Sequence, residues 1–152
     1  YNGMIFSGDY KIILNSGNYV PLATLDMKLK PGKNYQVFEV NPYLRIIEPE
    51  ISVIGRKVVA KFKLEQVTSN EVYRISLFAH SHIDVSNKLN IVNRTEELNR
   101  SITDGEAFEL SINLDDYTST LVPGKSYYFR IGAQSHGSET KYNYSASVQL
   151  DI

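Results

Sequence analysis

Residues Leu121–Ala133 read LVPGKSYYFRIGA, and this stretch decides the predicted fold. Pro123 and Gly124 form a turn pair, because proline presets its φ and glycine tolerates a positive one. A strand with a period of two follows the turn. One face of that strand holds Tyr127, Phe129, Ile131 and Ala133, and the other holds Tyr128, Arg130, Gly132 and Gln134. This alternation predicts an antiparallel strand with one buried face.

The order of these residues resembles the E–F corner of fibronectin type III and other immunoglobulin-like domains. In that corner a tyrosine ring packs in the core while its hydroxyl caps the turn. The resemblance implies that Tyr127 is buried and that its hydroxyl bonds back to the turn, whereas Tyr128 points outward.

Composition narrows the class of protein. The chain has 152 residues and a net charge of −1, from 16 basic and 17 acidic side chains. A nearly neutral chain has no basic field for nucleic acid, so we expect no nucleic-acid partner. Cysteine is absent, which excludes disulfides and thiolate metal sites. No apolar run reaches membrane-spanning length, and we interpret the chain as a mature or trimmed fragment.

Residues 1–41 are predicted to form a first unit. Its expected strands are Tyr10–Leu14, Leu25–Leu29 and Tyr35–Val40, with a short extended edge segment at Tyr19–Leu22. These are too few strands for an independent sandwich. Their order resembles the second half of a transthyretin-like (carboxypeptidase-regulatory-like) β-sandwich, whose first half is missing from this chain.

Residues 42–152 are predicted to form a second unit, because Pro42 disfavours helix at Asn41 and marks a boundary. The expected strands are Tyr43–Ile47, Ile51–Ile54, Lys57–Leu64, Val72–Ala79, Phe108–Leu114, Ser126–Gln134 and Tyr142–Leu150. The first two are pieces of one strand broken at Pro49, and His80–Glu106 is expected to be irregular. The fold class is therefore all-β, with an immunoglobulin/fibronectin type III-like sandwich after the partial one.

The alternation also assigns side chains to faces. The inward residues of Val72–Ala79 are expected to be Tyr73, Ile75, Leu77 and Ala79. Those of the last strand are expected to be Tyr142, Tyr144, Ala146, Val148 and Leu150.

Three stretches are similar to a family of two-domain Bacteroidetes lipoproteins, domain-of-unknown-function family 3823. They are Phe6–Lys11, Phe38–Ile46 and Tyr127–Ser135. The resemblance implies an extracytoplasmic, lipid-anchored protein at the cell surface or outer membrane, although the lipobox cysteine is absent from this chain. It implies a glycan-uptake system, with an outer-membrane transporter and its glycan-binding lipoprotein as partners. It implies no catalytic residue and no cofactor.

The strongest candidate for a ligand site is a set of side chains predicted to face solvent on one sheet. They are Arg74, Phe78, Tyr128, Arg130 and Asn143. An outward phenylalanine beside tyrosine and arginine is uncommon on a protein surface and would suit a sugar ring. The alternative is that this cluster packs on the first unit or lies under His80–Glu106.

A metal site is a weaker hypothesis. His80 and His82 lie two residues apart at the end of a predicted strand, and Asp84 follows them, so the three would point the same way. His136 is a possible further ligand. The alternative is that these are ordinary loop histidines, and we expect no metal.

Paired carboxylates for glycoside hydrolysis are the last candidate. Asp104 with Glu106, and Asp115 with Asp116, lie in predicted turns. Acidic residues in turns more often stabilise the turn itself. Three functions follow in order of preference: a non-catalytic glycan-capturing accessory lipoprotein, a structural spacer without a ligand, and a hydrolase.

Overall fold

The structure, a computed structural model, describes residues 5–14, 17–138 and 140–152 of the chain. Those residues contain β-strands, one short 3₁₀ helix, η1 (Leu114–Tyr117), and no α-helix. No helix among them is long and apolar enough to cross a membrane. The predicted all-β class is confirmed.

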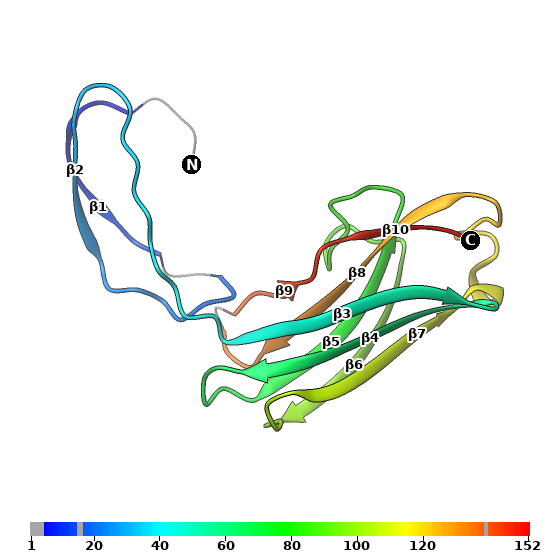
Figure 1. The fold of residues 1–152 in the computed structure, drawn as a ribbon. Helices are drawn as coiled ribbons and strands as arrows, with labels where there is room; N and C mark the ends of the chain where they lie inside the picture. Colours follow the sequence, from blue (N-terminus) through cyan, green and yellow to red (C-terminus); the bar gives the residue numbers. More distant parts are fainter. Residues whose placement is uncertain (1–4, 15–16, 139) are drawn as a thin grey trace.

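Two antiparallel sheets form a sandwich from residue 44 onward (Figure 1). The three-stranded sheet has the order β3 (Leu44–Ile54), β4 (Lys57–Gln66) and β7 (Glu106–Asn113). The other sheet has the order β10 (Val148–Asp151), β8 (Ser126–Ser135), β5 (Val72–His80) and β6 (Val92–Arg100). The short β9 (Asn143–Tyr144) also pairs with β8. This arrangement of two facing sheets is that of an immunoglobulin-like sandwich.

The core lies between the two sheets. Phe129 and Ile131 of β8 are fully buried and pack with Leu64 of β4 and Leu77 of β5. The predicted corner is confirmed, because Tyr127 is buried and its hydroxyl bonds to the turn before β8. β3 runs through Pro49 as one strand, with a bulge between Ile47 and Glu50 where the predicted break lies.

A second bulge changes the faces of β5. It lies between Val72 and Arg74, so Val72 joins the core in place of Tyr73. The prediction that Tyr73 points inward is therefore wrong, because the extra residue shifts the alternation.

The last predicted strand is divided into β9 and β10. Their pairings with β8 differ in register by one residue, since Tyr144 is opposite Gly132 whereas Val148 is opposite Phe129. A shift of one residue moves side chains to the other face. Tyr142 and Tyr144 therefore pack outside the core, which makes their predicted inward placement wrong, and Ala146 is exposed.

The prediction that His80–Glu106 is irregular is wrong for its second half, which contains β6. Among the described strands, β6 pairs with β5 alone and forms the edge of its sheet. Most of its side chains are exposed on both faces. Because Val92 and Leu98 at its two ends are its residues that pack on the core, apolar and polar residues do not alternate between them, so the sequence resembles a loop.

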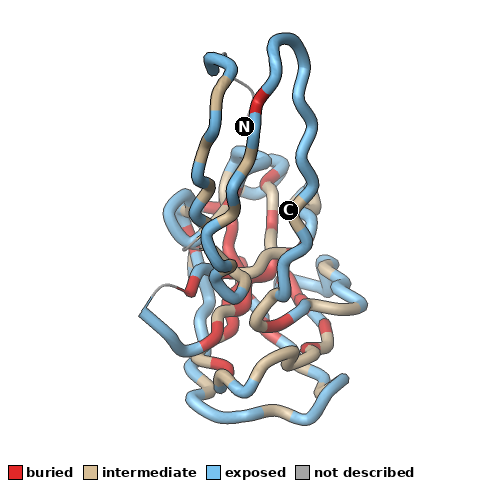
Figure 2. The backbone as a smooth tube through the Cα atoms, turned by 90° about the vertical axis from the view of Figure 1, so that its left-hand side faces the viewer, coloured by how far each residue is buried: buried red, intermediate tan, exposed pale blue. Residues whose placement is uncertain are grey.

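The first unit is a hairpin of β1 (Gly8–Ile12) and β2 (Leu25–Leu29) at one end of the sandwich (Figure 1). Most of it is exposed, in contrast to the sandwich (Figure 2). The predicted strand Tyr35–Val40 is wrong, because these residues do not pair with a strand, and Tyr35 and Val37 are strongly exposed. A strand needs a neighbour for its backbone hydrogen bonds, and no described segment supplies one.

Backbone bridges join the hairpin unit to the sandwich. Gly17 pairs with Thr140, and Tyr19 pairs with Pro42. The Val20 amide also donates to the Asn41 carbonyl at 2.8 Å. The short extended segment predicted around Pro21 is therefore attached to the start of the sandwich.

Candidate functional site

Aromatic rings gather on the outer face of the sheet that contains β5 and β8, the face that points away from β3, β4 and β7. Phe78 meets Tyr142 edge to face at 5.5 Å between ring centroids, and Tyr142 stacks on Tyr144 at 5.6 Å. The rings lie against Gly132 of β8. A Cβ atom at Gly132 would come within 2.9 Å of ring atoms of both Phe78 and Tyr142. The absence of a side chain at Gly132 is therefore what allows this packing.

Two arginines flank the rings. The guanidinium carbon of Arg74 lies 5.1 Å from the Tyr142 ring centroid, and that of Arg130 lies 4.6 Å from the Tyr144 ring centroid. These are cation–π distances. The Arg74 Nε also donates to the Gln134 side chain at 3.0 Å. Both arginines are thus held in place by protein groups.

The loop of residues 81–91 covers the rings. Val85 is fully buried against them, and its carbonyl accepts from Arg130 Nη1 at 3.4 Å. The Tyr144 hydroxyl donates to Asn87 Oδ1 at 2.8 Å and accepts from the Asn87 amide at 3.1 Å. Burial raises the pKa of Tyr144, so its hydroxyl stays protonated and can keep donating.

The structure brings four of the five predicted ligand residues onto one face but not into one exposed platform. Phe78 is 3% exposed, so the prediction that it faces solvent is wrong. The alternative, a cluster covered by part of His80–Glu106, describes the structure instead. Arg74, Tyr128 and Arg130 are half-buried around the cluster.

Asn143, the fifth residue, holds the two units together. Its Nδ2 donates to the Leu44 carbonyl at 2.8 Å. Its Oδ1 accepts from Asn18 Nδ2 and from the Tyr144 amide, each at 3.0 Å. Asn143 is half-buried and both ends of its amide are occupied by protein groups, so the prediction that it faces solvent and a ligand is not supported by its surroundings.

An exposed row of hydrogen-bonding side chains lies on the outer face of β6, beside the covered rings. We call it the polar row; its members are Asn93, Thr95, Glu97 and Asn99, at every second position. Thr95 lies opposite Ser76 of β5, and Glu97 lies opposite Arg74. His136, just after β8, extends the row because its Nε2 lies 2.9 Å from Asn99 Oδ1.

Hydrogen bonds fix the polar row to the buried rings. The hydroxyls of Thr95 and Ser76 lie 2.9 Å apart, and Ser76 Oγ lies 3.0 Å from the Tyr142 hydroxyl. The Tyr73 hydroxyl donates to Glu97 at 3.3 Å. The row is therefore oriented by the sheet beneath it, as a recognition surface requires.

Sequence reasoning missed the polar row because it treated residues 80–106 as a loop. The sequence offered no strand signal there, because the residues between Asn93, Thr95 and Glu97 are also polar and nothing alternates.

The histidine candidates do not assemble into a metal site. His80 Nδ1 accepts from the His82 amide, and His82 Nδ1 accepts from the Asp84 amide and lies 3.5 Å from its carboxylate. His136 instead contacts Asn99. Among the residues that the structure describes, no group of three or more histidine or acidic side chains is placed to hold a metal ion.

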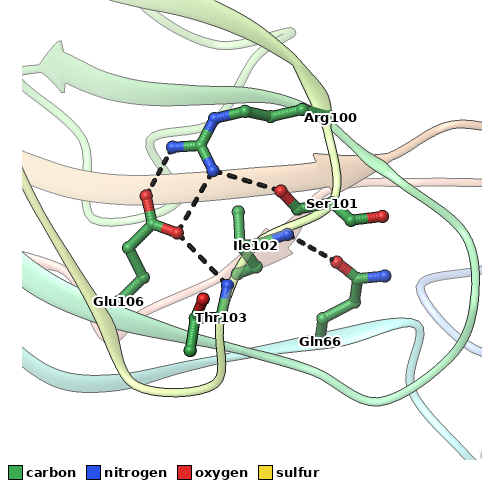
Figure 3. Close-up of polar contacts among 6 residues, drawn as sticks. All are labelled: Gln66, Arg100, Ser101, Ile102, Thr103 and Glu106. Atoms are coloured by element: carbon green, nitrogen blue, oxygen red, sulfur yellow. Dashed lines mark hydrogen bonds and ion pairs between the residues drawn. The ribbon is translucent and has the colours of Figure 1, made fainter.

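The candidate carboxylates are engaged in turns. Glu106 forms an ion pair with Arg100 and accepts from the Thr103 amide at 3.2 Å (Figure 3). The Arg100 guanidinium holds the pKa of Glu106 below its usual range. A carboxyl that stays ionised cannot serve as the general acid of a glycosidase.

The other three carboxylates bind separate neighbours. Asp104 accepts from the Gln66 amide at 3.1 Å, and Asp115 accepts from Arg56 at 2.9 Å. Asp116 accepts from the Asn113 side chain at 3.2 Å. The Asp116 contact lies within its turn, as the alternative to catalysis expected, whereas Asp104 and Asp115 bond to residues far away in the sequence.

Comparison with protein families shows to which family the chain belongs. The model of the domain of unknown function DUF3823_C matches residues 44–149, and that of the DUF3823 N-terminal domain matches residues 1–41. This chain belongs to the DUF3823 family. The resemblance inferred from the sequence is confirmed. A search of curated proteins gives no match.

Solved structures resemble this DUF3823 protein along almost its whole length. One is described as a candidate carbohydrate binding protein from Bacteroides uniformis ATCC 8492; it shares 29% identity and a TM-score of 0.90 over 99% of this chain and 77% of that one. A DUF3823 protein from Parabacteroides merdae ATCC 43184 shares 22% identity and a TM-score of 0.80, over 97% and 72%. Another, from Bacteroides ovatus ATCC 8483, shares 19% identity and a TM-score of 0.76, over 98% and 76%.

Proposed function

We propose that this protein binds carbohydrate, without catalysis, through the polar row of β6 and the adjacent Arg74. The observation that carries the proposal is the polar row itself, an exposed and pre-oriented set of amide, hydroxyl and carboxylate groups. The similar protein from Bacteroides uniformis, described as a candidate carbohydrate binding protein, supports the same class of ligand.

The chemistry of the row suits a sugar. A sugar presents many hydroxyls, each of which both donates and accepts. Asparagine offers a donor and an acceptor on one planar group, and glutamate accepts from two hydroxyls at once. Glu97 also lies opposite Arg74 in the register of β5 and β6, so an acceptor residue and a donor residue are neighbours on the two strands.

Stacking of aromatic rings on a sugar should contribute less to the binding affinity than the sequence suggested. Phe78 is buried and Tyr142 nearly so, which leaves the half-buried Tyr128 and Tyr144 at the margin of the surface. We therefore expect hydrogen bonds to supply most of the affinity, and binding to a single site to be weak.

The cellular setting belongs to the same proposal. We place the protein at the cell surface or outer membrane, held by a lipid anchor outside this chain. There it would assist an outer-membrane transporter and its glycan-binding lipoprotein partner. The family resemblance supports this setting.

A structural spacer without a ligand is the second candidate. Asn143 of the sandwich accepts a hydrogen bond from Asn18 of the hairpin unit, and the rings beside the polar row are covered. Both features suit a module that holds its neighbours in a fixed arrangement.

Affinity electrophoresis distinguishes the two candidates. The chain is run through gels containing xylan, pectin, mannan, starch or mucin glycans. We expect at least one glycan to retard it, and the variant Asn93→Ala with Glu97→Ala to lose that retardation at an unchanged melting temperature. The matched control, Glu109→Ala with Ser111→Ala, changes exposed residues of β7 on the other sheet. No retardation by any glycan, or equal retardation of both variants, would contradict the proposal.

A further inference from the structure

One edge of β6 is free among the described strands, and this edge is separate from the polar row on the outer face of the strand. β6 has nine residues and hydrogen-bonds to β5 along one edge. Its other edge pairs with no strand among residues 5–14, 17–138 and 140–152. A long free edge presents a row of unpaired backbone N–H and C=O groups, which another strand can use.

The side chains of β6 on the core-facing side have a self-complementary order. Val92 is buried and Leu98 is partly buried against the core, and between them Arg94 and Glu96 are exposed. Along the strand the order is therefore apolar, positive, negative, apolar. Reversed, as in an antiparallel partner, it becomes apolar, negative, positive, apolar.

We propose that β6 pairs antiparallel with β6 of a second copy of this chain, around a two-fold axis at Thr95. Arg94 then lies opposite Glu96 of the second copy, and Val92 lies opposite its Leu98. The two-fold axis repeats each pair, which is the isologous contact of a symmetric dimer. Opposite charges directly across an antiparallel pair are stabilising, and like charges there are destabilising.

Neighbouring registers are disfavoured by the same rule. Centring the pairing on Arg94 would place two arginines opposite each other, and centring it on Glu96 or Glu97 would place two glutamates opposite each other. Centring on Thr95 avoids like-charge pairs and also places Asn93 opposite Glu97 of the second copy. Most edge strands use charge to prevent association, whereas this pattern favours one register of self-association.

The dimer would join the β6-containing sheets of the two copies into one continuous sheet with a common outer face. The two polar rows would then lie beside each other across the axis. If the proposed glycan binding holds, a polymeric glycan could contact both rows at once. Its second contact would then be made at a high effective concentration, which raises the overall affinity.

Sedimentation equilibrium with charge-reversal variants tests the pairing without any glycan. We expect the wild-type chain to dimerise, and Arg94→Glu and Glu96→Arg each to weaken the dimer by about tenfold or more, since each reversal creates like-charge pairs. The double variant Arg94→Glu with Glu96→Arg restores opposite charges and should restore the dimer. Glu109→Arg, an exposed charge reversal on β7, should leave it unchanged.

Crosslinking tests the position of the axis. The chain has no cysteine, so Thr95→Cys introduces a single thiol opposite its own copy. Oxidation should give a covalent dimer from Thr95→Cys and much less from the exposed control Ser111→Cys on β7. A monomeric wild type would overturn the proposal. So would a dimer insensitive to both reversals, a double variant that fails to recover, or equal crosslinking of the two cysteine variants.

Discussion

The hydroxyl of Tyr127 donates a hydrogen bond to the carbonyl oxygen of Thr120 at 3.1 Å. The same hydroxyl accepts from the Val122 amide at 3.0 Å. One buried side chain thus satisfies two backbone groups of the turn and fixes where β8 begins. The turn in question contains Gly124, whose φ of 80° favours glycine.

Replacing Tyr127 by phenylalanine should destabilise the protein by about 1–2 kcal/mol, because the ring stays buried while two backbone groups lose their partner. The neighbouring change Tyr128→Phe is the control, since Tyr128 points to the other face and is half-buried. Urea denaturation of both variants measures the difference. An equal or larger loss from Tyr128→Phe would refute the assignment of faces on β8.

Gly132→Ala should destabilise by about 1–3 kcal/mol, because the new Cβ would overlap the rings packed on Gly132. Adding Phe78→Leu removes one of those rings, so the two changes together should cost less than their separate costs summed. Thermal unfolding of the two single variants and the double variant completes the cycle. Strict additivity would show that Gly132 and Phe78 are not in contact.

The ion pair of Arg100 with Glu106 should make the stability of the fold depend on pH in the acidic range. The pKa of Glu106 lies below its ordinary value of 4.5, chiefly because Arg100 donates a hydrogen bond to it. This contribution to stability is therefore present above pH 4.5 and is lost as the pH falls through the lowered pKa. Glu106→Gln and Arg100→Gln should each flatten the fall in melting temperature below pH 4.5. An unchanged slope in either variant would disagree with this account.

Limited proteolysis should begin in the hairpin unit. Lys33 lies in an exposed segment without a strand partner, whereas Arg94 lies within β6. Trypsin is therefore expected to cut after Lys33 first, since cleavage requires a locally mobile chain. Mass spectrometry of the first fragments to appear identifies which bond trypsin cuts first. Initial cleavage after Arg94 would show that β6 is not a stable strand.

Much of the fold could be predicted because local chemistry determined it. The strand Ser126–Ser135 differs by one residue from its predicted bounds, since its buried face alternates without interruption. The Pro-Gly turns also behave as expected, with Gly32 and Gly124 at φ of 95° and 80°. In these places propensity, pattern and packing agree.

The candidate site could not be predicted, because it depends on the register between strands and on the loop that covers the aromatic rings. A bulge turned Tyr73 away from the core, and a one-residue shift between β9 and β10 moved Tyr142 and Tyr144 to the outer face. Loop residues 81–91 then covered Phe78. None of these follows from the period of a single strand, because each depends on how one segment meets another.

The most direct test of the proposed function is a titration of the ¹⁵N-labelled chain, followed by amide chemical shifts, with soluble oligosaccharides from the glycan that retards it in gels. The account predicts saturable shifts concentrated on Asn93, Thr95, Glu97 and Asn99, with weaker shifts at Arg74. Shifts confined to the hollows of the hairpin unit, beside Tyr10 and Met27 or beside Val37, would place binding elsewhere. Shifts at neither place, at any concentration of sugar, would contradict carbohydrate binding by this chain.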